Sequence, residues 1–63
     1  CPQVVVEVRA ETDSWATLQE KIERYRTNGA GYALAIDPYQ RDTFAVGQPP
    51  PGLILDIKAI IDA

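Results

Sequence analysis

Residues 3–9 form an almost continuously apolar, β-branched run, Gln-Val-Val-Val-Glu-Val-Arg, which limits the folds open to this chain. Valine is enriched in strands because its branched side chain packs well on a pleated surface. A short apolar run without alternation predicts a central strand that is covered on both faces. Because successive side chains of a strand point to opposite faces, Glu7 shares a face with Val5 and Arg9. The predicted strand therefore carries one acid within an apolar setting, and Arg9 at its end is expected either to be solvated or to be a second cation near Glu7.

An amphipathic helix is predicted directly after this strand. Thr, Asp and Ser at positions 12–14 are favourable N-cap residues, and Asn-Gly at 28–29 favours a left-handed stop. Between these signals, large apolar side chains recur with helical spacing and form one stripe, which we expect to be core. The stripe consists of Trp15, Leu18, Ile22 and Tyr25. Lys21 lies beside this stripe and not on the opposite, solvent-facing side of the helix.

Two further strands are predicted in the middle of the chain. Residues 32–37 form the second strand, which ends at an Asp-Pro turn in which Asp37 is interpreted as the turn-forming residue. Residues 43–46 form a short third strand, joined to the second by a hairpin. A strand–helix–strand order favours a parallel pair with a right-handed crossover. The predicted fold class is therefore α/β (α+β), a small mixed β-sheet with one main crossover helix.

The C-terminal part of the chain is less regular. Three consecutive prolines at 49–51 predict a stiff, extended loop. Residues 53–55 predict a brief strand, and Asp56 is placed to cap a final helical turn or two. Three isoleucines of that turn are expected to face inward: Ile57, Ile60 and Ile61.

Size and charge limit the possible functions. A chain of 63 residues is one domain at most, close to the lower limit for folding alone. The net charge of −3 does not favour broad electrostatic attraction to DNA, because a free-standing nucleic-acid-binding domain is usually basic. The chain opens on Cys1-Pro2 and enters a strand at once, so we expect residues 1–63 to be a piece of a longer polypeptide.

The residue types present also limit the chemistry. One cysteine allows no internal disulfide, and the absence of histidine excludes the usual zinc patterns. A bound metal ion would need oxygen ligands, which favours magnesium, calcium or manganese. No apolar run approaches the roughly 18 residues of a membrane span. We therefore expect no membrane partner and a cytoplasmic location.

Glu7 and Lys21 are the residues with the clearest chemical potential. A carboxylate on a buried strand is costly unless it is paired, hydrogen-bonded or bound to a metal ion. In one interpretation Lys21 forms a structural ion pair with Glu7 where the helix crosses the sheet. In the other, the same acid and lysine are half of a metal-dependent phosphodiesterase site, which needs carboxylates for the ion and a cation for the transition-state charge.

The order of the motifs resembles that of a bacterial family of putative restriction endonucleases within the PD-(D/E)xK nuclease superfamily. The segments that carry the resemblance are Pro-Gln-Val-Val-Val-Glu-Val-Arg at 2–9, Lys21 and Tyr25 four positions apart, Asn-Gly-Ala at 28–30, Ile-Asp-Pro at 36–38, and Pro-Gly-Leu-Ile-Leu-Asp-Ile at 51–57. Lys21 follows Glu7 by fourteen positions, which fits the family pattern. The resemblance covers nearly all of this chain but only the C-terminal part of a family member.

The resemblance implies a metal-dependent DNA endonuclease that hydrolyses phosphodiester bonds with Mg²⁺ or Mn²⁺. Glu7 would be the second metal-binding acid, and Lys21 the catalytic lysine, carried on the helix. The first metal-binding aspartate would lie on an upstream strand that this chain does not contain, so this restriction-endonuclease-like core fragment would be incomplete and inactive alone. Gln3 stands where the family often has aspartate, which points to a degenerate copy. The alternative is a non-catalytic structural or dimerisation module, and an exposed edge strand in an incomplete sheet would favour a homo-oligomer.

Overall fold

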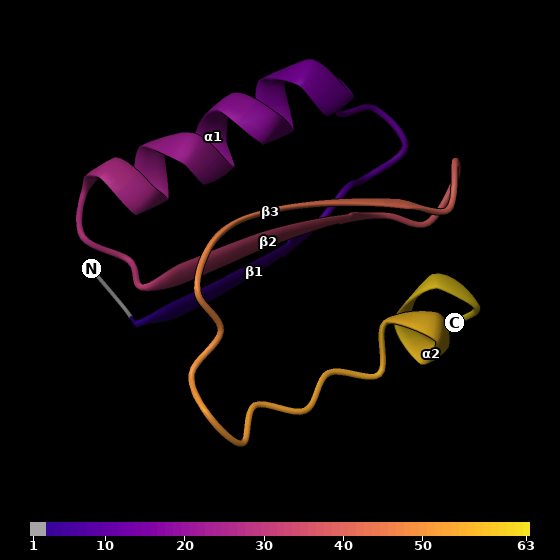
Figure 1. Cartoon of the computed structure of the whole chain (residues 1–63). Coiled ribbons are helices and arrows are strands. Elements are labelled where there is room, and N and C mark those ends of the chain that lie inside the picture. Colours follow the sequence, from indigo (N-terminus) through magenta and orange to yellow (C-terminus); the bar gives the residue numbers. More distant parts are fainter. Residues whose placement is uncertain (1–2) are drawn as a thin grey trace.

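A computed structural model describes residues 3–63 as a three-stranded sheet with two helices (Figure 1). The elements are β1 (Val4–Val8), α1 (Trp15–Thr27), β2 (Tyr32–Asp37), β3 (Asp42–Gly47) and α2 (Ile57–Ile61). The predicted fold class, a small mixed α+β structure, is confirmed. Cys1 and Pro2 lie outside the described residues, and the first motif of the resemblance, at 2–9, begins at Pro2. Within residues 3–63, neither helix is long and apolar enough to cross a membrane.

The sheet has the order β1-β2-β3. β1 and β2 are parallel, with Glu7 opposite Ala35, and α1 forms the crossover between them. β2 and β3 are antiparallel, with Ala35 opposite Phe44. The topology thus follows the prediction, with one correction. β1 is not a central strand covered on both faces but an edge strand, and its side chains Val6 and Val8 are 38% and 49% exposed.

Helix α1 begins and ends where the sequence indicates. Ser14 is the N-cap, and its hydroxyl oxygen accepts a hydrogen bond from the backbone N–H of Thr17. Asn28 is the C-cap, and Gly29 follows with a φ of 108°, a conformation that glycine adopts at little cost. Local chemistry at both ends therefore fixes the length of the helix and the position of Lys21 along it.

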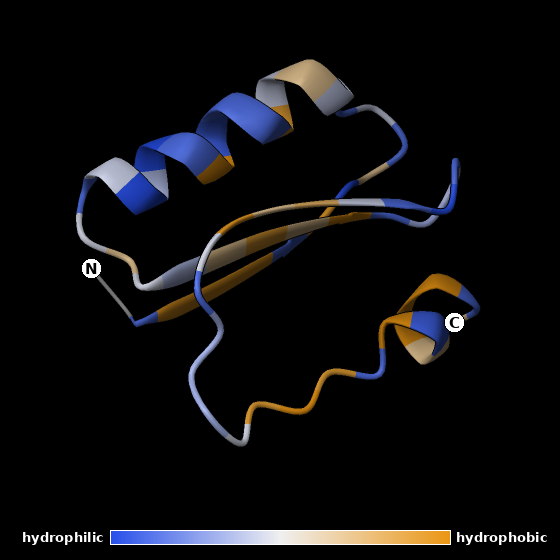
Figure 2. Cartoon of the chain, in the orientation of Figure 1, coloured by the Kyte–Doolittle hydropathy of each residue, from blue (hydrophilic) through white to orange (hydrophobic). Residues whose placement is uncertain are grey.

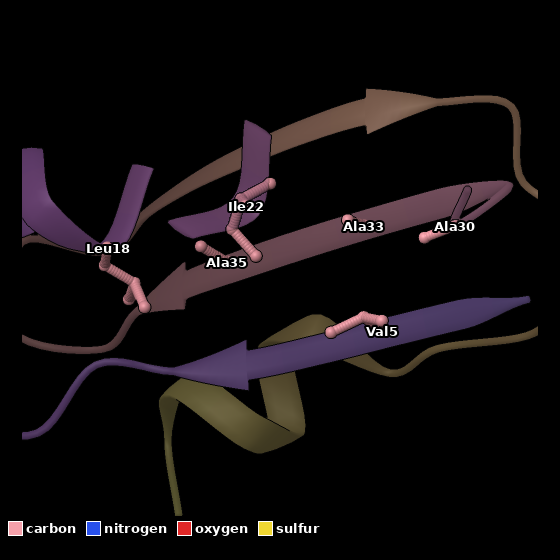
Figure 3. Packing of buried hydrophobic residues seen from close by; sticks show 6 residues of the cluster. All are labelled: Val5, Leu18, Ile22, Ala30, Ala33 and Ala35. Atoms are coloured by element: carbon pink, nitrogen blue, oxygen red, sulfur yellow. The ribbon is translucent and has the colours of Figure 1, made fainter. Parts of the chain in front are cut away.

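The core lies between α1 and one face of the sheet (Figure 3). Leu18 and Ile22 project from the helix toward small side chains on β2, and Ile22 is fully buried. The cluster is completed by Val5, Ala30, Ala33 and Ala35. The alanines let the helix approach β2 closely, and Figure 2 shows the apolar side of α1 turned toward the sheet.

The opposite face of the sheet is only partly covered. Leu34 and Ile36 of β2 alternate with the alanines, so they point to this face, where both are buried. Helix α2 lies on this side and contacts β2 (Figure 1). Asp56 caps α2 as predicted, accepting from the N–H of Ala59. The three inward-facing isoleucines of α2 are partly buried: Ile57, Ile60 and Ile61.

Residues 53–55 do not form the predicted strand. The segment follows a turn at Gly52, where φ is 83°, and it is not hydrogen-bonded into the three-stranded sheet. A strand needs a neighbour to pair with, and the segment runs to α2 as an apolar loop instead (Figure 2). Ile54 within it is 90% exposed.

Candidate active site

The structure brings Glu7 and Lys21 together. Glu7 lies on the face of β1 that α1 covers, and Lys21 is on the second turn of that helix. The Nζ atom of Lys21 lies 3.4 Å from Oε1 of Glu7. The Lys21 side chain is 50% exposed and the Glu7 side chain 28%, so the pair sits at the rim of the core and is open to solvent. Both interpretations of the pair require this proximity.

Tyr25 joins the pair through its hydroxyl group. The hydroxyl donates a hydrogen bond to the same Oε1 atom of Glu7, at 3.1 Å, and Lys21 Nζ lies 5.9 Å from the centroid of the ring. The sequence assigned Tyr25 to the core stripe, and the ring is indeed partly buried there. The helical spacing of apolar side chains identifies the Tyr25 ring as core but carries no information about its hydroxyl group. The sequence signal for this contact was that the residue one helical turn after Lys21 is a tyrosine and not a purely apolar residue.

The electrostatics of the pair define what Lys21 can do. The hydrogen bond and the negative charge of Glu7, with a smaller contribution from Tyr25, raise the pKa of Lys21 above its ordinary value of 10.5. The ammonium group is therefore charged at neutral pH. It is suited to stabilising negative charge on a substrate, and it is unsuited to accepting a proton from an attacking water.

A pocket of about 240 Å³ opens beside the pair, between β1 and the start of α1. Its walls carry two carboxylates, two hydroxyl groups, one ammonium group and one apolar side chain: Glu7, Asp13, Ser14, Thr17, Lys21 and Leu18. Asp13 was considered in the sequence only as a helix cap. In the structure it lines this pocket, while its Oδ2 atom accepts from the N–H of Ala10.

The oxygen donors of the pocket fit a magnesium ion in part. Magnesium is commonly held by one or two carboxylates, with water and substrate phosphate completing its coordination. Glu7 and Asp13 are carboxylates of that kind on one pocket. Among residues 3–63, however, no group of three or more acidic, cysteine or histidine side chains is placed to share an ion. Any ion at this site would depend on ligands from a substrate or a partner.

Arg9 is not solvated, and it does not pair with Glu7. Its Nη1 atom lies 3.3 Å from Oδ1 of Asp37, a carboxylate that is fully buried at the end of β2. Its Nε atom donates to the carbonyl oxygen of Asp13 at 2.8 Å, and its guanidinium lies over the ring of Tyr39. Arg9 therefore ties the loop that carries Asp13 to the sheet and so supports one wall of the pocket.

Asp37 has the predicted role as turn-former and a second role as the partner of Arg9. Its Oδ1 atom accepts from the backbone N–H groups of Tyr39 and Gln40. Burial by itself raises the pKa of Asp37, but these hydrogen bonds and the charge of Arg9 outweigh that effect. The pKa of the carboxyl group therefore lies below its ordinary value of 3.8.

The stability of the fold is expected to fall as the pH drops below about 3.8, the ordinary pKa of an aspartate. A carboxyl group with a lowered folded-state pKa stabilises the fold above its unfolded pKa, and this contribution is lost as the pH falls through the folded pKa. Acid titrations followed by circular dichroism should show a weaker acid dependence for Asp37→Asn. Asp62→Asn, which breaks the exposed Arg41–Asp62 pair, is the matched control. Equal acid dependence for Asp37→Asn and the native chain would contradict this assignment.

Comparison with known proteins identifies a family for this chain. A family model named Uma2, described as "Putative restriction endonuclease", matches residues 1–57 of the chain. No curated protein and no solved structure shows significant similarity to this chain. The matched range spans β1, α1, β2, β3 and the start of α2, and it includes both Glu7 and Lys21.

Proposed function

Because this chain belongs to the putative restriction endonuclease family, we propose that it supplies the acid and lysine of a metal-dependent DNA endonuclease centre. The reaction is hydrolysis of a DNA phosphodiester bond with Mg²⁺ or Mn²⁺. The single observation that carries the proposal is the contact of Lys21 with Glu7, at 3.4 Å, on the wall of an open pocket. In this proposal the fold is a PD-(D/E)xK core whose lysine has moved to the helix, and the protein acts on DNA in the cytoplasm.

Glu7 is the proposed metal ligand. The contacts with Lys21 and Tyr25 both fall on Oε1. In this proposal they orient the carboxylate, and its second oxygen, Oε2, binds the ion. A bound divalent ion lowers the pKa of a coordinated water and polarises the phosphoryl oxygen.

Lys21 is the proposed stabiliser of the phosphate. Hydrolysis of a phosphodiester places additional negative charge on the phosphoryl oxygens, and a fixed cation beside them lowers the barrier. Lys21 is charged at neutral pH, since its pKa lies above the ordinary value of 10.5. Its half-exposed ammonium group can reach a phosphate that enters the pocket while it still contacts Glu7.

A second copy of the chain is the proposed source of further carboxylates. β1 lies at one end of the sheet, and among residues 3–63 no strand covers its outer edge. Edge strands are usually protected by unpaired charges or by proline. The single charged side chain in Val4–Val8, Glu7, forms an ion pair with Lys21. Val6 and Val8 are exposed. We therefore propose a homodimer in which two β1 strands pair and bring two Glu7 side chains to one centre.

The alternative function is a non-catalytic dimerisation module. One observation favours it, because residues 3–63 contain no group of three potential metal ligands. In that case the Glu7–Lys21 pair would be structural, as an ion pair that offsets the cost of a carboxylate near the core. The same open edge of β1 would then serve association alone.

Calorimetric titration with Mn²⁺ distinguishes these functions. Mn²⁺ prefers the same oxygen ligands as Mg²⁺. We expect the native chain to bind the ion, Glu7→Gln to lose binding, and Lys21→Gln to bind at least as tightly, because it removes a cation that competes for the carboxylate. Glu11→Gln, an exposed acid in the loop after β1, is the matched control and should bind like the native chain. Absence of binding by the native chain, with lowered stability in both pair variants, would establish the structural ion pair instead.

A further inference from the structure

A second hollow lies along α1, beside the pocket that contains Glu7. It measures about 230 Å³ and is lined by Lys21, Arg24, Tyr25 and Asn28. Lys21 and Tyr25 thus belong both to the candidate active site and to this hollow. We propose that this hollow is a subsite for the phosphodiester group that neighbours the scissile one on the same DNA strand. The inference rests on the proposed nuclease function and deepens it.

Arg24 carries the charge of this subsite. Among residues 3–63 its side chain makes no ion pair, although Glu20 lies one turn before it on α1. Arg24 is exposed to solvent, and so is Asn28. An exposed guanidinium that no carboxylate neutralises is available to an anion from solution. Lys21, in contrast, is already engaged by Glu7.

The groups around the hollow are those that proteins use on nucleic-acid backbones. A guanidinium binds two phosphate oxygens through parallel hydrogen bonds, and an asparagine amide donates to a third. Three residues along a helix correspond to a rise of about 4.5 Å. Successive nucleotides of a DNA strand are spaced by about 3.4 Å along the helix axis. Arg24 is therefore offset from Lys21 by a distance on the scale of one nucleotide step.

The positive charge beside this hollow also explains how a chain of negative net charge could bind DNA. The chain has a net charge of −3, so its attraction to DNA cannot come from its total charge. Because Lys21 is paired with Glu7, Arg24 supplies the unpaired positive charge on this side of α1, where a strand would enter. DNA would then be held by few phosphate contacts, and its affinity would depend weakly on salt.

The test is the salt dependence of DNA binding by Arg24→Gln. The binding of a fluorescently labelled duplex would be measured by anisotropy over a range of salt, with Ca²⁺ in place of Mg²⁺ to prevent cleavage. Loss of one phosphate contact should reduce the slope of log K against log salt by about 0.9. Lys58→Gln is the matched control, since it removes the same charge from α2, on the opposite face of the sheet, and should leave the slope unchanged.

The possible outcomes separate this inference from the proposed function. Equal slopes for Arg24→Gln and the native chain, with only the melting temperature lowered, would mean that Arg24 serves the helix terminus alone and would overturn the subsite. A reduced slope for Arg24→Gln in a chain whose Glu7→Gln variant still binds Mn²⁺ would support the subsite and refute the metal-ligand role of Glu7. Absence of duplex binding by the native chain would overturn both.

Discussion

Lys21→Gln is expected to lower the rate of metal-dependent DNA cleavage roughly 10²–10³-fold, the usual cost of removing one preorganised group that stabilises transition-state charge. The ammonium group of Lys21 lies at the pocket wall and is charged at neutral pH. Its loss should leave metal affinity intact, because Glu7 is retained. Nicking of supercoiled plasmid DNA at saturating Mn²⁺ measures this effect. A fall in rate without a fall in metal affinity would assign Lys21 to the chemical step.

A charge-matched variant controls this experiment. Lys58→Gln removes the same charge on the other side of the sheet and should cleave at the native rate. A rate of plasmid nicking by Lys21→Gln equal to that of the native chain would refute the role of this lysine.

A further variant tests the proposed pairing of two copies. Val6→Lys places a charge on the exposed side of the β1 edge and should abolish cleavage by preventing that pairing. Cleavage by the native chain should accordingly rise more steeply than in proportion to protein concentration.

Ile22→Ala is expected to destabilise the fold by about 2–5 kcal/mol, the range for truncating a large buried aliphatic side chain to alanine. Ile22 is fully buried between α1 and the alanines of β2, and it is the largest side chain of that cluster with no exposed surface. A domain of this size has little stability in reserve. The variant should therefore unfold at a much lower urea concentration than the native chain.

Urea denaturation followed by circular dichroism measures this loss. Glu23→Ala, the exposed neighbour of Ile22 on α1, is the matched control and should change the unfolding free energy by less than about 0.5 kcal/mol. Equal denaturation midpoints for Ile22→Ala and Glu23→Ala would show that the α1 interface contributes little to stability.

The elements that the sequence predicted well are those whose signals are local. The caps of α1 at Ser14 and Asn28 and the bounds of β2 follow from residues within a few positions of each end. The predicted central position of β1 was wrong, because an apolar run reports the type of side chain and not the number of neighbouring strands. The run at 53–55 failed as a strand for a related reason, since the sheet offers it no partner.

The sequence by itself determined that an acid and a lysine would meet where a crossover helix packs on a strand. The periodicity of α1 and the alternation of β1 fix the faces on which Lys21 and Glu7 lie. Only the tertiary structure decided which other groups join them. The hydroxyl of Tyr25 reaches Glu7 from 18 positions away, and Arg9 pairs with the buried Asp37 across 28 positions. Such contacts depend on the distance and angle at which helix and strands pack, and local sequence patterns do not encode those quantities.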